Sequence, residues 1–374
     1  MNINDEYKDL VNYYDQRLPG QEQTVKEVIM NLKLRDVYAM EKIRNKGQLF
    51  TPPLNLLVRG SSGSGKTHAI KTICATLGIP FVAVNITDFT SSGYVGSSLA
   101  DILKSLTEAA EPYARAEIKA EKKLKEQDQP KPPPGKRIKP TPKHSDDFND
   151  LISSILRKQS GGGKDDSEAV RKRAKMIAQT RGVVMLDEID KILMSTGQQY
   201  NIGTSGIVRE ILTYLSGSII SSSEHGSFDT TNVIFICAGA FDLVKFSAIP
   251  TELLGRLPTR IVVNDPTKET FLKMIQSSVI DMWGGLNLIL SNKGVGSFEI
   301  PIDVAEHMAE TLERDEKIKP IGVRRLTTAV NDITKQYFVN DDIKNLPKLV
   351  LTKEVVDEVL STIQAGLIDG TTNN

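Results

Sequence analysis

One segment of the chain has residue types and spacing suited to binding a phosphate chain. Residues 60–67 read GSSGSGKT and fill every fixed position of the pattern G-x-x-x-x-G-K-[ST]. Gly60 and Gly65 would let main-chain N–H groups approach an anion, because neither residue carries a Cβ. Lys66 would reach the β- and γ-phosphates, and the Thr67 hydroxyl would ligate Mg²⁺. The chemistry predicted here is the binding of a nucleotide together with magnesium.

The segments that flank these residues support this interpretation. Leu54–Val58 is short, apolar and strand-like, and Thr67–Leu77 has the pattern of a helix. A strand, a glycine-rich turn and a helix N-terminus together surround a phosphate with backbone N–H groups. The alternative is a surface turn rich in serine and glycine, which would not need this strand and helix on its two sides.

Two carboxylates follow a second apolar run. Val183–Leu186 is strand-like, and Asp187 and Glu188 come directly after it. In a nucleotide site the first carboxylate would hold Mg²⁺, directly or through water, and the second would polarise the water that attacks the γ-phosphate. An acidic pair at a strand end is common by itself. Together with the upstream phosphate loop it predicts hydrolysis.

Arginines occur in two further glycine-containing segments. Arg256 lies in GRLP at residues 255–258, where it is either a surface ion-pair residue or an arginine finger for a neighbour's γ-phosphate. Arg324 and Arg325 follow Gly322 at the predicted start of a helix. Cations there oppose the helix dipole, which favours a bound anion or an acidic partner over solvated charge.

A short loop carries two apolar side chains between glycines. Residues 93–96 read GYVG, so that two glycines bracket Tyr94 and Val95. Exposed apolar groups are costly unless something contacts them. Such side chains would need a partner that contacts them, but from these four residues alone a turn with a partly buried tyrosine is the favoured interpretation.

Composition restricts the function classes. The 374 residues suffice for two or three domains, and 47 Lys+Arg balance 47 Asp+Glu, so charge favours neither nucleic acid nor an anionic membrane. The only cysteines, Cys74 and Cys237, lie in apolar stretches, which suggests buried thiols in a reducing compartment. No apolar run reaches about 18 residues, and the start MNINDEYKDL is unlike a signal peptide. We expect a cytoplasmic protein without a membrane partner, in a bacterium or, if viral, in the host cytoplasm.

Patterning predicts an α/β fold with a doubly wound parallel sheet. Asn4–Lys46 is helical in character, with a break at Pro19–Gly20. Beyond it, apolar runs alternate with helical patterns, as in parallel strands that are buried on both faces. The predicted strands are Asn55–Val58, Phe81–Asn85, Val183–Leu186, Val233–Ala238 and Ile261–Val263.

The predicted domains are a large α/β domain at residues 1–264 and a smaller helical domain at 265–374. The large domain carries an insertion, residues 108–179, that is partly helical and partly extended or disordered. Its predicted parts are a charged helix Glu111–Gln127, a proline-rich stretch Pro130–Pro142, a short helix Asp147–Lys158 and a basic helix Ser167–Gln179. It is either a solvated linker or a partner-contact surface. In the smaller domain we predict helices at Thr267–Trp283, Pro301–Arg314, Gly322–Tyr337 and Lys353–Gln364, and a loop at Gly284–Gly296.

Taken together, these residues resemble the Clp/HslU branch of the AAA+ ATPases, which are ring-forming protein unfoldases, and within that branch most closely HslU. The resemblance covers nearly the whole chain from Leu18 to Leu326 apart from the insertion. The matching stretches, in chain order, are RLPGQEQTVKEVI, GSSGSGKT, SSGYVGSSLADILKSLTEAA, VVMLDEIDKI, SSEHGSFDTTNVIFICAGAF, LLGRLPTRIVV and IGVRRL.

The resemblance implies a set of ATP-binding and catalytic residues. Leu18 and Pro19, with Ile321, would pack on adenine. Glu188 would be the catalytic carboxylate, Arg256 the arginine finger and Arg324 the sensor-2 arginine. Thr67 and Asp187 would hold Mg²⁺. The full ATP-binding set implied is Leu18, Pro19, Ser62, Gly63, Ser64, Gly65, Lys66, Thr67, His68, Asp187, Ile321 and Arg324.

The resemblance also implies a mechanical role. Tyr94 and Val95 match the pore loop that grips a polypeptide, and Met194–Gly203 occupies the place of a second pore loop. The insertion stands where HslU carries its intermediate domain, but it is much shorter. An arginine finger requires a neighbouring subunit, so a homohexamer and a protein substrate are the implied partners.

The chain departs from the family pattern at several places. Ala238 replaces a small polar sensor-1 residue, Ser216 replaces a glutamate, and Pro250 is displaced by one position. The chain ends DGTTNN, whereas HslU ends in an apolar tail that docks into its peptidase. A peptidase or adaptor partner is therefore left open.

Three hypotheses follow from these residues. The first is an ATP-driven protein unfoldase or remodeller. The second is an AAA+ switch or assembly scaffold that binds ATP without threading a substrate. The third and least favoured is a nucleic-acid motor or loader, for which the basic insertion is the only support.

Overall fold

The structure is a computed structural model that describes residues 3–44, 51–89, 99–127, 164–195, 202–222, 226–242, 249–316 and 318–371. Tyr94 and Val95, residues 128–163 and residues 196–201 lie outside these ranges. The predictions made for the pore loop, for most of the second pore loop and for the centre of the insertion therefore stay predictions.

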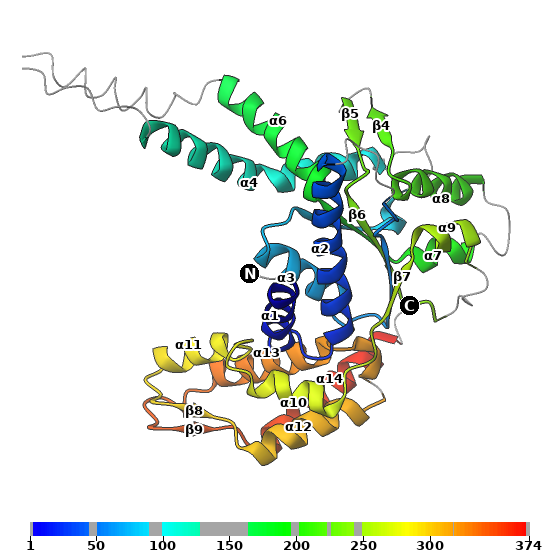
Figure 1. Cartoon of the computed structure of the whole chain (residues 1–374). Coiled ribbons are helices and arrows are strands. Elements are labelled where there is room, and N and C mark those ends of the chain that lie inside the picture. Colours follow the sequence, from blue (N-terminus) through cyan, green and yellow to red (C-terminus); the bar gives the residue numbers. More distant parts are fainter. Residues whose placement is uncertain are drawn as a thin grey trace, which may run out of the picture.

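A five-stranded parallel sheet forms the centre of the chain, as the sequence predicts (Figure 1). Its order is β2-β3-β6-β1-β7. The strands are β1 (Leu56–Arg59), β2 (Phe81–Asn85), β3 (Val183–Asp187), β6 (Ile234–Gly239) and β7 (Thr259–Val262). Because all strands run the same way, their carboxyl ends meet at one edge. This edge carries the phosphate loop after β1 and Asp187 at the end of β3, and ligands bind at such an edge in open α/β sheets.

Helices cover both faces of the sheet because successive strand residues point to opposite sides. Leu56 and Val58 belong to one apolar cluster, and Leu57 belongs to the other. The first cluster includes residues of α1 (Ile3–Asp15), α2 (Glu22–Arg44) and α3 (Lys66–Thr76). The second includes residues of α4 (Leu99–Gln127), α6 (Lys164–Arg181), α7 (Ile189–Ser195), α8 (Ile202–Leu215) and α9 (Thr251–Arg256).

Helices α4 and α6 pack side by side and extend away from the sheet (Figure 1). The predicted charged helix begins earlier than expected, because α4 already starts at Leu99 and buries Ile102 and Leu106 in the core. Pro112 lies inside α4. Arg173 of α6 forms ion pairs with Glu117 and Glu121 of α4 and so joins the two helices where they leave the sheet.

A two-stranded hairpin, β4 (Ile219–Ser222) and β5 (Gly226–Asp229), was not predicted from the sequence. Its strands are short, and their residues do not form an apolar run. Thr230 holds the hairpin to α8, because its hydroxyl hydrogen-bonds the Tyr214 carbonyl at 3.2 Å.

The C-terminal part of the chain has a hydrophobic cluster of its own, formed by residues between Phe271 and Ile363. The elements of this C-terminal part are α10 (Lys268–Gln276), α11 (Gly284–Asn292), α12 (Ile302–Arg314), α13 (Arg324–Val339) and α14 (Lys353–Thr371), with a short parallel pair of strands, β8 (Phe298–Glu299) and β9 (Leu349–Val350).

Two predictions in this part were wrong. The expected loop at Gly284–Gly296 is instead the helix α11, because Leu286 and Leu290 stand four residues apart and are both buried. The expected helix Thr267–Trp283 ends at Gln276, and the Ser277 hydroxyl accepts hydrogen bonds from the Val279 and Ile280 N–H groups.

Among the described helices, none is both long enough and apolar enough to span a bilayer.

Candidate nucleotide site

The phosphate loop joins the end of β1 to the start of α3. Gly63 and Gly65 have φ angles of 76° and 91°, in the left-handed region that glycine adopts without strain. A Cβ on Gly60 would lie 2.7 Å from the Val263 carbonyl oxygen, so this glycine allows the loop to pack on the end of β7. The sequence predicts that Gly60 lets the main chain approach an anion. In the structure, the lack of a Cβ at Gly60 is needed for the packing of the loop on Val263.

The Lys66 side chain folds back onto the phosphate loop that precedes it. Its ammonium group donates to the carbonyl oxygens of Gly60 at 2.6 Å and Ser61 at 2.8 Å. Burial lowers the pKa of Lys66, and the nearby Asp187 carboxylate opposes this shift. The side chain is therefore a partly desolvated cation, which attracts an anion more strongly than a solvated lysine would.

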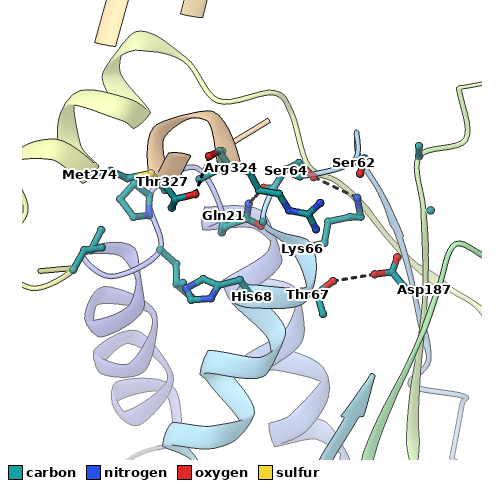
Figure 2. Close-up of a pocket in the computed structure, with 18 of the residues that line it drawn as sticks. Gln21, Ser62, Ser64, Lys66, Thr67, His68, Asp187, Met274, Arg324 and Thr327 are labelled. Carbon is teal, nitrogen blue, oxygen red and sulfur yellow. Dashed lines mark hydrogen bonds between the residues drawn. The ribbon is translucent and has the colours of Figure 1, made fainter. Parts of the chain in front are cut away.

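Thr67 and Asp187 face each other at the edge of the sheet. The Thr67 hydroxyl donates to the Asp187 carboxylate, with 3.0 Å between Oγ1 and Oδ2 (Figure 2). A hydroxyl oxygen and a carboxylate oxygen at this spacing are hard oxygen donors of the kind that Mg²⁺ prefers. The residues present thus fit a magnesium ion that is also held by nucleotide phosphates.

Glu188 adopts a positive φ of 60°, which is uncommon for a residue with a side chain. Its carboxylate accepts hydrogen bonds from the Asn85 amide at 2.9 Å and from the Lys191 ammonium at 2.7 Å. The Lys191 hydrogen bond lowers the pKa of Glu188, although partial burial opposes the shift. Glu188 is therefore held as a charged carboxylate next to Asp187.

A cavity of about 650 Å³ opens over these residues, within the size range of small-molecule sites. The C-terminal helices supply one wall of it: Met274, Arg324 and Thr327 lie across from Lys66 and the phosphate loop (Figure 2). The cavity lining also contains apolar residues suited to contact an aromatic base, namely Leu18, Pro19, Met274, Ile280, Met282, Val323 and Val330.

Arg324 and Arg325 have different environments although they are neighbours in sequence. Arg324 is exposed in the cavity near Lys66 (Figure 2). Arg325 is 1% exposed, and its guanidinium lies over the Phe271 ring, 4.8 Å from the ring centre. Burial lowers the pKa of Arg325, and the Asp265 carboxylate opposes this shift. Only the first arginine is available to a ligand of the cavity.

Comparison with known proteins agrees with this geometry. Residues 56–118 match the family described as "ATPase family associated with various cellular activities (AAA)", and residues 156–278 match the "AAA domain (Cdc48 subfamily)". Relatives named "ATP-dependent protease ATPase subunit HslU" align over almost the whole chain. That of Helicobacter pylori (strain P12) is 25% identical over 96% of this chain and 96% of its own length. That of Persephonella marina is 26% identical over 95% of this chain and 96% of its own length.

The chain is a divergent, HslU-like AAA+ ATPase. A third relative of the same name, from Chelativorans sp. (strain BNC1), is 24% identical over 94% of this chain and 95% of its own length. The five-stranded parallel sheet with the loop after β1 is consistent with an AAA+ P-loop core. Hydrolysis of ATP is thus the activity of this chain, and the cavity between sheet and C-terminal helices is its candidate nucleotide site.

Most of the residues that the sequence singled out line the cavity of this AAA+ ATPase. Those found there are Leu18, Pro19, Ser62, Gly63, Ser64, Gly65, Lys66, Thr67, His68, Asp187, Glu188 and Arg324. Ile321 is not in the lining: its carbonyl oxygen packs against Gly63, and its side chain packs on the C-terminal cluster. Ala238 lies within β6 and is fully buried, whereas the next two residues, Gly239 and Ala240, line the cavity.

Arg256 lies outside the cavity lining, at the end of α9. Its Nε donates to the Ser216 hydroxyl at 2.5 Å, and its Nη1 lies 3.3 Å from a Glu252 carboxylate oxygen. An arginine finger that acts on a neighbouring subunit would be expected outside its own cavity. The position of Arg256 is therefore compatible both with a finger and with a surface ion-pair residue, the two alternatives that the sequence leaves open.

Several polar contacts around the site were not found from the sequence. Gln21 hydrogen-bonds the phosphate loop, Asn85 holds Glu188, and buried Asp190 accepts from the Phe241 N–H at 3.1 Å. Each joins residues at least 43 positions apart. The only available signal was the location of Asn85 at the end of a predicted strand, beside the strand that ends in Asp187.

Proposed function

We propose that the chain is an ATP-driven protein unfoldase or remodeller that works as a homohexameric ring. The observation that carries this proposal is one cavity lined by Lys66, Thr67, Asp187, Glu188 and Arg324, with one wall from the sheet edge and another from the C-terminal helices. The relatives are named as ATPase subunits of an ATP-dependent protease, which supports work on protein substrates. A peptidase or adaptor partner is part of the same proposal.

Hydrolysis in this proposal uses the residues at the ends of β1 and β3. The loop N–H groups and Lys66 hold the phosphate chain, and Thr67 and Asp187 hold the ion. When bound, Mg²⁺ would neutralise charge on the phosphate oxygens. Glu188 accepts the proton of the attacking water, because its carboxylate is kept charged by Lys191 and positioned by Asn85.

Arg256 is the proposed arginine finger for the site of the next subunit. Reaching a neighbour requires it to leave the Ser216 hydroxyl and the Glu252 carboxylate, both of which are weak surface contacts that an anionic γ-phosphate can replace. A guanidinium brought to this position stabilises the charge of the transition state. The ring is therefore needed for full activity.

We propose that residues 1–264 and 265–374 act as two domains that move against each other during the cycle. The cavity wall contributed by Arg324 and Met274 belongs to the second, and the phosphate loop belongs to the first. Binding and hydrolysis would change the contact between the two and move Tyr94, the proposed substrate-gripping residue, along the ring axis.

The test begins with the Glu188→Gln variant, which should bind ATP, assemble and retain its protein substrate. A captured protein is identified by mass spectrometry and then offered to the wild-type ATPase, and its unfolding is measured as ATP-dependent sensitivity to a protease. The Tyr94→Ala variant should keep its ATPase activity and lose unfolding. If Tyr94→Ala processes the same protein at the wild-type rate, threading is contradicted and the chain acts as a switch or scaffold.

A further inference from the structure

Gln21 lies against the phosphate loop although it belongs to no part of the loop pattern. It is 7% exposed, and its Nε2 donates to the Ser64 carbonyl oxygen at 2.6 Å (Figure 2). A carbonyl oxygen can only accept a hydrogen bond, so this contact fixes which end of the amide is the NH₂ group. Gln21 is thus a buried donor that is committed to one loop carbonyl.

Thr24 fixes the other end of the same amide. Its hydroxyl donates to the Gln21 Oε1 atom at 3.1 Å, and Thr24 itself is 1% exposed. Both residues stand at the start of α2, one turn apart, where the backbone is held by helix hydrogen bonds. The Gln21 side chain therefore has one preferred orientation, because each of its polar atoms has a buried partner.

The contact with Ser64 determines the direction of the next N–H group in the loop. The Ser64–Gly65 peptide is planar and trans, so its C=O and N–H point in opposite directions. A carbonyl held by Gln21 turns the Gly65 N–H away from Gln21. Gly65 is the N-cap of α3, where backbone N–H groups are free to bind an anion.

The loop closely fits the Gln21 amide. A Cβ on Gly65 would stand only 3.2 Å from the Gln21 Nε2 atom, so a side chain at position 65 would crowd the Gln21 amide. The preceding carbonyl, that of Gly63, is held separately by the Val323 N–H at 2.9 Å. Two successive loop carbonyls are thus each held by a group from another segment of the chain.

We propose that Gln21 is a positioning residue for the phosphate loop: its amide holds the Ser64 carbonyl so that the Gly65 N–H faces the nucleotide phosphates, and Thr24 orients the amide. The inference rests on the proposed role of residues 60–67 in holding phosphate. Gln21 also follows Leu18 and Pro19, so the turn that contacts the base would at the same time set the loop that contacts the phosphates.

The test compares ADP, which reaches the loop, with adenosine, which has no phosphate. Gln21→Met removes the donor at similar side-chain length, and Gln23→Met, two residues along and exposed, is the matched control. Calorimetric titration of Gln21→Met should show ADP affinity reduced about tenfold, the value of one hydrogen bond to a charged group, with adenosine affinity unchanged. Gln23→Met should match the wild type with both ligands.

Equal losses for ADP and adenosine would overturn the inference, because they would indicate general damage to the site. Unchanged ADP affinity would overturn it as well. The proposed phosphate-loop role fails separately, if the wild-type chain binds ADP no more tightly than adenosine. Thermal unfolding of each variant shows whether it is folded.

Gln21→Glu supplies a second test that depends on pH. A protonated carboxyl can donate to the Ser64 carbonyl, and a carboxylate cannot. The ADP affinity of Gln21→Glu relative to the wild type should therefore rise as the pH falls. A ratio that stays constant with pH would contradict the proposed donor role.

Discussion

Glu188 is held between a neutral donor and a cation, and each partner affects it differently. Asn85 comes from the neighbouring strand end and fixes where the carboxylate lies, whereas Lys191 comes from the following helix and keeps it charged. Because Glu188 is about one-third exposed, solvent screens the Lys191 pair. We expect the pair to set the pH dependence of activity more than the stability of the fold.

The Glu188→Gln substitution should lower kcat by about 10²- to 10⁴-fold, because an amide cannot accept the proton of the attacking water. ATP binding should persist, since Lys66 and Thr67 are unchanged. Steady-state ATPase measurements and nucleotide titration give the two values. Turnover close to that of the wild type would show that another group serves as the base.

Replacing Lys191 by Met should shift the acid limb of the pH–rate profile to higher pH. As the proposed base, Glu188 must be a carboxylate, so activity is expected above its pKa and is lost as the pH falls through it. The Lys191 hydrogen bond lowers this pKa, and its removal raises the pKa. Lys71→Met, on the exposed side of α3, is the control. An acid limb at the same pH in both variants would refute the assigned role of Lys191.

At the residue scale, the sequence predicts the groups that belong to local patterns. Lys66, Thr67, Asp187 and Glu188 stand in short motifs, so their roles could be hypothesised before the fold was known. The contact from Gln21 to the loop joins positions 43 residues apart. Such a contact depends on how the helices pack and has no signature in a single sequence.

At the scale of elements, the phosphate loop packs between the sheet edge and the segment before α13. A Cβ on Gly63 would lie 2.2 Å from the Ile321 carbonyl oxygen, and Gly63 has a φ of 76°. The loop between β1 and α3 thus accepts only glycine at this position. The Val323 N–H also donates to the Gly63 carbonyl at 2.9 Å, which joins the loop to the start of α13.

Gly63→Ala should therefore destabilise the fold by about 1–3 kcal/mol, the usual cost of a side chain in a strained backbone conformation. Nucleotide affinity should fall with it. Thermal unfolding and ADP titration measure the two effects. If the variant keeps the wild-type melting temperature and affinity, the loop is not packed as the structure describes.

Gly206→Ala is the matched opposite case. Gly206 is exposed inside α8, and a Cβ there meets no atom within 4 Å. Alanine in an exposed helix interior is favoured over glycine by up to about 1 kcal/mol, so this variant should melt higher than the wild type. A lower melting temperature would contradict the helical assignment of this segment.

Elements with strong periodicity were predicted well, and those that depend on packing were not. The five strands were predicted from short apolar runs, which parallel strands inside a covered sheet typically have. Helix α11 was missed because its two glycines and polar ends resemble a loop, and only the burial of Leu286 and Leu290 shows why it is helical. The hairpin β4–β5 was missed because its strands face solvent as much as core.

At the scale of the whole molecule, the site lies between the sheet and the C-terminal helices, and Arg256 stands outside it. This arrangement explains why one subunit would carry an incomplete site under the proposed function. Arg324 and Met274 line the cavity on one side, and the phosphate loop lines it on the other side. Motion between these two walls is the proposed link between hydrolysis and work on a protein.

Under the proposed function, we expect ATP to drive assembly of the ring. The chain should elute as a monomer or small oligomer without nucleotide and as a hexamer with ATP, as measured by light scattering after size-exclusion chromatography. Glu188→Gln should give the most stable ring, because its ATP is not consumed. A chain that stays monomeric in saturating ATP while hydrolysing it at full rate would contradict the ring.

The most direct measurement mixes two inactive variants. Under the proposed function, Arg256→Ala keeps an intact site but lacks the proposed finger, and Glu188→Gln keeps that finger but has a site that cannot turn over. Each alone should hydrolyse ATP poorly. In a mixed ring, the Arg256 of a Glu188→Gln subunit can complete the site of an Arg256→Ala neighbour, so the mixture should regain ATPase activity well above the sum of its parts. Activity equal to that sum, in rings shown to contain both variants, would contradict hydrolysis at a shared site.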